Sequence, residues 1–311
     1  MLGSAPCPSA VCTSIARTTD GGIQWEGIPA PVAPLAGGGE IAGPGVGQLV
    51  FADARDGWAY GPALYSTHDG GSTWQRVALP SGATAITSMA AAGGDIFAVA
   101  ATNNGAGPPM LLRAADSGDS FVSVGNGPPA SAPALAAAGN RAWALGADSL
   151  QVIPAGGGNA STLKDPCPNT GGAGAIAGWS STQVVVVCAE SGGLGSEAKK
   201  AFLSANGGST FTPTSTNPPA QGEVESAGTN GTTVVVGASS GATDLYATYN
   251  EGHSWSTAYA DSSGGAPLSD VGFTTTTQGV AIEGVAGTGP QPFLLMTTDG
   301  GHSWSRVPIV G

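Results

Sequence analysis

The chain has 311 residues and is rich in glycine (52) and proline (23), while 41% of its residues are hydrophobic and 10% are charged. This hydrophobicity permits a large buried core, which excludes an intrinsically disordered chain. Nine basic residues against 21 acidic ones give a formal net charge of −12. So few cations exclude nucleic-acid binding and adhesion to anionic lipid, and no stretch approaches the roughly 18 apolar residues needed for membrane insertion.

The amino-terminal segment MLGSAPCPSAVC has neither a basic region nor a long apolar region, so it does not look like a signal peptide. The low lysine content, the acidic balance and the four cysteines are nevertheless typical of exported proteins. We therefore expect an extracellular, cell-surface or periplasmic protein whose export signal is absent from this chain. The same argument leaves open a native start upstream of Met1.

The cysteines form two local pairs, Cys7 with Cys12 and Cys167 with Cys188. Neither pair has CxxC spacing, and only three histidines could complete a zinc site, so no metal site is expected. We expect two disulfides, each within its own repeat unit. Buried thiols are the alternative.

A short phrase recurs along the whole chain. Its copies are TTDGGIQW (18–25), STHDGGSTW (66–74), AADSGDSF (114–121), SANGGSTF (204–211), TYNEGHSW (248–255) and TTDGGHSW (297–304). The acidic or amide residues in these copies are spaced by 49, 47, 90, 44 and 49 positions. The interval of 90 is two periods, and VIPAGGGNASTL (152–163) stands where a degenerate copy belongs. The chain therefore contains seven units.

Each unit consists of short β-rich runs separated by Gly, Asn, Asp and Pro turns, without a helical period. Four strands in each of seven units predict an all-β, seven-bladed β-propeller with four-stranded antiparallel blades. We expect one domain over 1–311, with blades near 1–30, 46–79, 84–124, 133–163, 172–214, 222–258 and 267–308. In the first unit MLGSAP fits a second strand and SIARTTD a third, so this blade is expected to lack its innermost strand. The fourth unit should have the most irregular third-to-fourth turn.

The residue types of the recurring phrase predict a hairpin turn between the third and fourth strands. The side-chain oxygen of Asp69 or Asn206 can accept backbone N–H bonds, and Gly70 and Gly71 supply positive φ values. Because Asn replaces Asp in two copies, the turn needs an acceptor oxygen, which argues against catalysis or metal binding there. The expected structural residues are Asp20, Trp25, Asp69, Trp74, Asp116, Phe121, Asn206, Phe211, Asn250, Trp255, Asp299 and Trp304.

These copies resemble the Asp-box, or bacterial neuraminidase (BNR), repeat, and the resemblance covers the whole chain. It implies a propeller of the broad group that includes sialidases and other glycosidases, sortilin-like receptors and photosystem II assembly factors. The units of about 45 residues look most similar to exported bacterial propellers grouped with the assembly factors. Since propellers of this kind have many functions, the resemblance implies a fold and leaves the function open.

Evidence for an enzyme is weak, and no catalytic residue can be named from the sequence. The six arginines do not fall where a sialidase would need its triad. A different glycoside hydrolase would need two facing carboxylates, for which Glu223, Glu225 and Asp270 are candidates because their strands approach the central channel. The glycine runs lack the lysine of a phosphate-binding loop, so no cofactor is expected.

The interpretation we favour is an exported, non-catalytic binding or assembly scaffold. A carbohydrate-active glycoside hydrolase and a structural cell-surface or adhesin module are the alternatives. The partner, an unknown protein or glycan, should bind the face opposite the box turns, where variable loops gather at 29–46, 101–109, 190–200 and 285–292. Lys199 and Lys200, with Glu223, Glu225 and Asp270, are the candidate contacts on that face, the lysines toward an acidic group.

Overall fold

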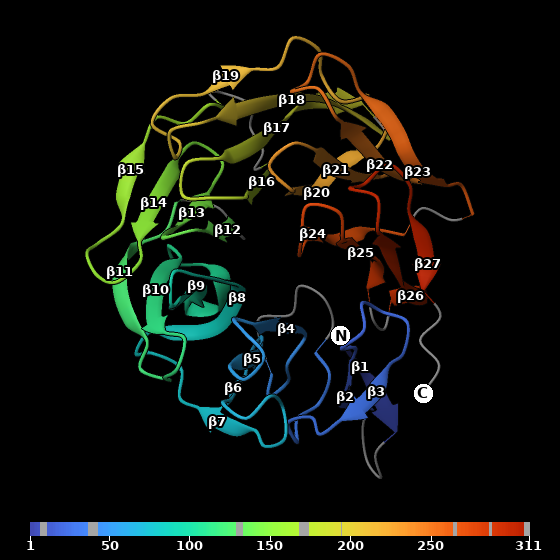
Figure 1. Cartoon of the computed structure of the whole chain (residues 1–311). Coiled ribbons are helices and arrows are strands. Elements are labelled where there is room, and N and C mark those ends of the chain that lie inside the picture. Colours follow the sequence, from blue (N-terminus) through green and yellow to red (C-terminus); the bar gives the residue numbers. More distant parts are fainter. Residues whose placement is uncertain are drawn as a thin grey trace.

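The computed structural model describes residues 1–6, 11–36, 43–128, 133–167, 174–193, 195–263, 266–285 and 288–307. Seven antiparallel sheets stand around one axis and form a seven-bladed β-propeller (Figure 1). Six of the sheets have four strands and the first has three. Both the fold class and the short first blade confirm the prediction from the sequence.

The strands follow one another blade by blade. Blade 1 consists of β1 (Leu2–Pro6), β2 (Val11–Arg17) and β3 (Glu26–Ile28). Blade 2 consists of β4 (Gln48–Phe51), β5 (Gly57–Tyr60), β6 (Leu64–Thr67) and β7 (Gln75–Val77). Blade 3 consists of β8 (Ala83–Ala92), β9 (Asp95–Thr102), β10 (Met110–Ala115) and β11 (Val122–Asn126). Blades 4 and 5 consist of β12 (Ala134–Ala138), β13 (Arg141–Leu145), β14 (Leu150–Pro154), β15 (Ser161–Leu163); and β16 (Ala175–Gly178), β17 (Val184–Gly193), β18 (Ser196–Ser204), β19 (Thr212–Pro213). Blades 6 and 7 consist of β20 (Glu223–Thr229), β21 (Val234–Ser239), β22 (Thr243–Thr248), β23 (Ser256–Asp261); and β24 (Leu268–Phe273), β25 (Gly279–Val285), β26 (Thr288–Thr297), β27 (Ser305–Val307). One 3₁₀ turn, η1 (Asn103–Gly105), follows β9.

The hydrophobic core lies between the blades. Trp58 of blade 2 packs in one cluster with Ile86 and Leu112 of blade 3, and Trp143 of blade 4 packs with Val186 of blade 5. Both indoles are fully buried. A lone sheet would leave two apolar faces in water, so each blade is stable only against its neighbours.

Small residues allow the blades to approach one another. A Cβ atom added at Gly178 would lie 2.9 Å from the ring of Trp143 and 3.1 Å from Cβ of Ala138. Gly178 of the inner strand β16 therefore permits a close approach of blades 4 and 5 that a larger residue would prevent.

The box turns define one face of the ring, which we call the box face. Asp69 Oδ1 accepts the N–H of Thr73 (2.8 Å) and the hydroxyl of Thr67 (2.8 Å). Gly70 N–H in turn donates to the carbonyl of Arg55, in the turn between β4 and β5 (2.9 Å). First-to-second and third-to-fourth turns therefore share this face. The second-to-third turns and the connections between blades form the opposite face, the loop face.

Some details differ from or refine the predictions. Residues 190–200 were expected to be a variable loop, but β17 continues to Gly193 and β18 begins at Ser196, so most of that segment is a long hairpin. Residues 285–292 were also expected to be a loop, but β25 continues to Val285 and β26 begins at Thr288, so most of them belong to strands. In the fourth unit, Gly156, Gly157 and Gly158 all adopt positive φ, and no acidic anchor occupies this turn. Within the described ranges, no helix has the length and apolar character to span a membrane.

Candidate functional site

The inner strands β20 and β24 bring the candidate acids to the loop-face end of the ring. Every inner strand runs toward the box face, because it leads into the first-to-second turn. Glu223 and Glu225 are the first and third residues of β20, and Asp270 is the third residue of β24. All three side chains are exposed to solvent. The structure thus gathers them where their strands begin, near the axis.

Glu225 combines solvent access with internal bonds. Its Oε1 accepts the hydroxyl of Ser239 (2.5 Å), and its Oε2 accepts the backbone N–H of Leu268 in blade 7. The surrounding blades desolvate the carboxyl and raise its pKa, although these two bonds act in the opposite direction. Glu225 therefore ties blade 6 to blade 7 through the start of β24.

Asp270 is an exposed residue that is nevertheless partly desolvated by the protein around it. Desolvation by the neighbouring blades raises the pKa of Asp270, and the N–H of Val271 only partly offsets this. The pKa of Tyr60 is also raised, first by burial and then by the charge of Asp270. Tyr60 lies in blade 2 and donates its hydroxyl proton to Gln48 Oε1 (2.6 Å). The charge of Asp270 in blade 7 therefore affects Tyr60 in blade 2, on the other side of the short first blade.

Lys199 has a different environment from the exposed loop position expected for it. Its side chain is 2% exposed. The three N–H donors of its ammonium are shared among five backbone carbonyl oxygens within hydrogen-bond distance of Nζ, those of Glu197 (3.0 Å), Pro219 (3.2 Å), Ala220 (3.2 Å), Gln221 (3.1 Å) and Gly222 (2.6 Å). Desolvation lowers the pKa of Lys199, and the charges of Glu197, Asp244 and Glu223 counteract it. Because the ammonium is enclosed by carbonyls, Lys199 holds the connection between blades 5 and 6 and offers no surface to a partner.

Lys200 is the lysine that remains accessible. Its ammonium lies 2.6 Å from Glu190 Oε1, and the two side chains are 49% and 29% exposed. Alternation along β18 explains the contrast, since consecutive strand residues point to opposite faces of the sheet.

The box residues serve the hairpin turns and the contacts between blades. The anchor oxygen accepts the backbone N–H four residues later in five copies, those with Asp20, Asp69, Asn206, Asn250 and Asp299. In the copy with Asp116, Ala114 stands in place of the hydroxyl residue. The indoles of Trp74 and Trp255 also donate to carbonyls of the preceding connections, at Pro29 (2.9 Å) and Thr216 (3.1 Å). The box aromatics therefore join neighbouring blades, which the local phrase did not reveal.

The expected disulfide of the fifth blade is present. Cys167 and Cys188 are bonded, with Cα atoms 5.4 Å apart and side chains 2% and 0% exposed. Such a bond is compatible with an oxidising compartment. Cys7 lies outside the described residues, so the pairing of Cys7 with Cys12 remains a prediction.

Among the described residues, no group of three or more His, Cys, Asp or Glu side chains is arranged so that it could hold a metal ion. Two shallow hollows open elsewhere on the ring, one beside Arg141 and Asn159 and the other beside Arg76 and Leu79. Neither contains Glu223, Glu225 or Asp270. The candidate acids are therefore an open surface near the axis rather than part of these hollows.

Sequence reasoning missed the role of His68 on the box face. His68 Nδ1 lies 2.5 Å from Asp56 Oδ1, and Nε2 lies 3.5 Å from Asp119 Oδ1 of blade 3. Partial burial lowers the pKa of His68, but the Asp56 bond and the charges of both carboxylates raise it overall. Since Asp119 lies 51 residues away in the chain, only the packing of blades 2 and 3 reveals this contact.

The ring and its open loop face define the class of protein: a seven-bladed propeller with exposed carboxylates near the axis. Solved structures with a similar fold include "YCF48 from Cyanidioschyzon merolae", with 18% identity, a TM-score of 0.58, and coverage of 90% of this chain and 89% of that one. Another, "YCF48 bound to D1 peptide", has 20% identity and a TM-score of 0.55 and covers 89% of this chain and 85% of that one. A third is the GH74 enzyme of Niastella koreensis, with 11% identity, a TM-score of 0.38, and coverage of 96% of this chain and 59% of that one. At these identities the likeness shows the fold. No protein-family model matches the chain, and no curated protein matches its sequence.

Proposed function

We propose that this protein is an exported, non-catalytic binding or assembly scaffold that engages a protein partner on its loop face. The observation that carries the proposal is the exposure of Glu223, Glu225 and Asp270 where the inner strands begin, against a box face whose turns bond mainly to one another. A rigid ring that presents polar side chains at one end is suited to recognition.

Three further observations support the proposal. One structure of similar fold is described as bound to a peptide, and a propeller of that kind therefore has a precedent for a protein ligand. The carboxylates favour a partner segment that carries lysine or arginine, since the chain has a formal net charge of −12. The Cys167–Cys188 bond fits the exported location.

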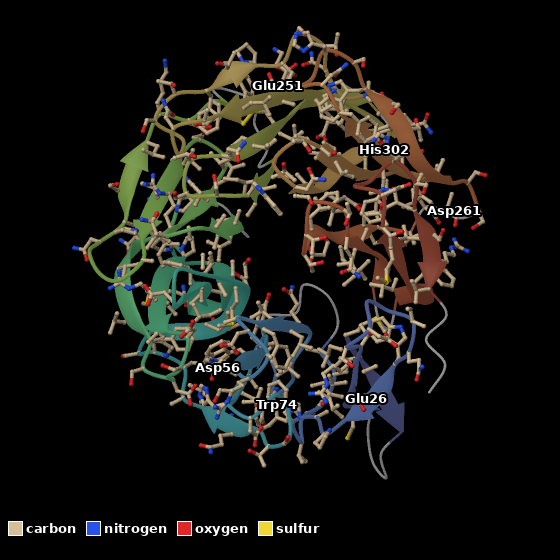
Figure 2. All side chains as sticks on the ribbon, viewed as in Figure 1. Glu26, Asp56, Trp74, Glu251, Asp261 and His302 are labelled. Carbon is tan, nitrogen blue, oxygen red and sulfur yellow. A yellow bond between two sulfur atoms is a disulfide. The ribbon has the colours of Figure 1, made fainter. Side chains whose placement is uncertain are left out.

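A matched pair of charge reversals tests the proposal. Glu223→Lys changes the loop face near the axis, and Glu251→Lys makes the same charge change in the box turn of blade 6 (Figure 2). Proteins retained by the wild-type chain from its host would be identified by mass spectrometry, and the affinity of the purified partner measured. We expect Glu223→Lys to weaken binding about tenfold or more and Glu251→Lys to leave it unchanged. Equal effects of both variants, or a partner retained only through the box face, would exclude the proposal.

A glycoside hydrolase is a second candidate because Glu225 and Asp270 both have raised pKa values, as a general acid requires. The internal bonds of Glu225 to Ser239 and Leu268 speak against it. Hydrolysis of a panel of polysaccharides, compared between the wild type and Asp270→Asn, decides between the two. Turnover that disappears in Asp270→Asn would favour the hydrolase.

A further inference from the structure

The degenerate box turn of blade 4 borders a hollow of about 260 Å³. The loops between the paired ends of the third and fourth strands have the same length in blades 2 and 4. Counted along these loops, Ala155 occupies the position of Asp69, and Asn159 occupies that of Thr73. The carboxylate that bonds to Thr73 in blade 2 therefore has no counterpart in blade 4, and Ala155 and Asn159 border the hollow instead.

The lining of this hollow combines hydrogen-bond donors with aliphatic surface. Arg141, Asn140, Asn159 and Ser161 supply N–H and O–H donors, while Val152 and Pro154 supply apolar contact. No carboxylate belongs to the lining, all of which lies within the described residues. A hollow that offers a guanidinium and two amides without an acid is complementary to an anion.

Arg141 is a half-buried arginine without an internal partner. Within the part of the chain that the structure describes, its guanidinium forms no hydrogen bond and no ion pair. It lies on the same face of blade 4 as Trp143, which packs against blade 5, and a Cβ atom added at Gly207 of blade 5 would lie 3.2 Å from its Cζ. The arginines that do donate to carbonyl or carboxylate oxygens are Arg17, Arg55, Arg113 and Arg306.

The corresponding position in blade 2 shows what Arg141 lacks. Arg141 precedes the buried indole of its second strand by two residues, as Asp56 does in blade 2. There Asp56 contacts His68, and Asp119 in the box turn of blade 3 completes the group. In the box turn of blade 5 the residue at the position of Asp119 is Ser209, whose hydroxyl is used within its own turn. The seam between blades 4 and 5 therefore has a cation where the seam between blades 2 and 3 has compensated charges.

Asp95 of blade 3 does not supply the missing charge, because it holds the degenerate turn from the other side. Its Oδ2 accepts the N–H of Gly156 (2.6 Å) and lies 3.7 Å from Nε of Arg113. Arg113 in turn donates to the carbonyls of Pro154 and Gly158 (both 3.1 Å). Blade 3 thus replaces the lost anchor, and Arg141 on the side of blade 5 stays uncompensated.

We propose that this hollow is a binding site for a small hydroxylated carboxylic acid of the size of one sugar residue, with a hexuronate as the model compound. The guanidinium of Arg141 holds the carboxylate through two parallel N–H···O bonds. The amides of Asn140 and Asn159 and the hydroxyl of Ser161 bond to the hydroxyl groups of the ligand. A volume of about 260 Å³ is below the range of about 300–1,000 Å³ for pockets that hold drug-sized ligands, which favours a single sugar unit. The site lies on the box face and does not depend on a partner at the loop face.

Titration of the purified full chain with sodium D-glucuronate provides the first test. We expect saturable chemical-shift changes at the backbone amides of residues 156–160, with a dissociation constant on the order of millimolar. D-glucose and sodium acetate, at matched ionic strength, should bind at least tenfold more weakly. Acetate that binds as well as glucuronate would show general anion adsorption, and glucose that binds as well would exclude recognition of the carboxylate. Either result overturns the proposal.

A matched pair of arginine variants tests the role of the guanidinium. Arg141→Gln should weaken glucuronate binding about tenfold or more, because the bidentate charged contact is lost. Arg76→Gln removes the same charge from an exposed arginine beside the other hollow and should leave the affinity unchanged. Equal losses in the two variants would assign the binding to net charge and would contradict the site.

A second substitution keeps Arg141 in place and changes only an exposed residue. Asn159→Asp puts a carboxylate at the rim of the hollow, where it competes for the guanidinium, and should abolish glucuronate binding. Asn104→Asp makes the same change in the exposed turn η1 and should have no effect. Wild-type affinity in Asn159→Asp would overturn the proposal. So would displacement of glucuronate by the peptide acetyl-Gly-Glu-Gly-amide at equal or lower concentration, which would assign the hollow to an acidic side chain of a protein.

Discussion

Lys199 Nζ lies 2.6 Å from the carbonyl oxygen of Gly222, and this bond joins the third strand of blade 5 to the residue just before the first strand of blade 6. Four further carbonyls surround the same ammonium. A buried cation without an ion-paired carboxylate is expensive unless its donors are fully used. Here the carbonyl groups of residues 219–222, together with that of Glu197, take the place of water.

Replacing Lys199 with methionine should destabilise the protein by about 3 kcal/mol, since the carbonyl oxygens around the buried ammonium, that of Gly222 above all, would lose their donor while an unbranched side chain is kept. Urea unfolding monitored by tryptophan fluorescence measures the change. Lys200→Met is the matched control, because the exposed ion pair with Glu190 contributes at most about 0.5 kcal/mol. Equal losses in the two variants would contradict the role of the carbonyl cluster.

His68 should make the stability depend on pH near neutrality. The pKa of His68 is raised in the folded state. The stabilisation of the fold by protonated His68 is therefore complete below the unfolded-state pKa of about 6.5, and it is lost as the pH rises through the folded-state pKa. We expect the melting temperature of the wild type to fall across that window and that of His68→Gln to change less. The groups that face His68 are Asp56, Asp119 and the guanidinium of Arg55.

The control for this experiment is His302→Gln. His302 belongs to the box turn of blade 7 (Figure 2), and its ring stacks on that of Tyr249 with centroids 3.9 Å apart. This variant should keep the pH dependence of the wild type. If His302→Gln removes the pH dependence of the melting temperature instead, the contact of His68 with Asp56 and Asp119 is not its source.

The anchor of a box turn should tolerate asparagine better than alanine. The hydroxyl and N–H of Thr73 lower the pKa of Asp69 to about 2. The contribution of ionised Asp69 to folding stability is therefore present above the unfolded-state pKa of about 3.9, and it is lost as the pH falls toward 2. Asp69→Asn keeps an acceptor oxygen, as Asn206 and Asn250 do in other blades. Thermal unfolding at pH 7 should rank the wild type first, Asp69→Asn second and Asp69→Ala last. An alanine variant as stable as the asparagine variant would show that the acceptor is dispensable.

Removing the disulfide should weaken blade 5. The bond links residues 21 apart in the sequence, and a loop of this size corresponds to about 3 kcal/mol in the chain-entropy model. The double variant Cys167→Ala/Cys188→Ala should therefore unfold at a lower urea concentration with a nearly unchanged slope. A midpoint equal to that of the wild type would contradict the prediction.

Local chemistry explains why the repeat could be interpreted correctly without coordinates. In the copy around Asp69, the turn is defined by bonds that span two and four residues, such as those to Thr67 and Thr73. Glycines at positive φ, including Gly70 and Gly71, complete it. The number of units, the four-stranded blades and the missing strand of blade 1 follow from the regular spacing of these turns along the chain. The pairing of Cys167 with Cys188 follows instead from their nearness in the sequence.

The candidate site was only partly predictable. That Glu223, Glu225 and Asp270 begin inner strands follows from their order in each unit, and the structure places all three at the same end of the ring. The partners of these residues do not follow from that order. Leu268 donates to Glu225 from the next blade, and the charge of Asp270 reaches Tyr60 in a blade about 200 residues earlier in the sequence.

The sequence by itself determined the repeat, the strands and the box turns of this protein, because the interactions that form them are short in range. Only the tertiary structure decided that Lys199 is enclosed by carbonyls while Lys200 stays in water, and that His68 lies between two aspartates. The physical reason is that the blades are stable only through contacts with their neighbours. Burial and charge at each side chain are consequently set by residues one or more blades away, which no local pattern records.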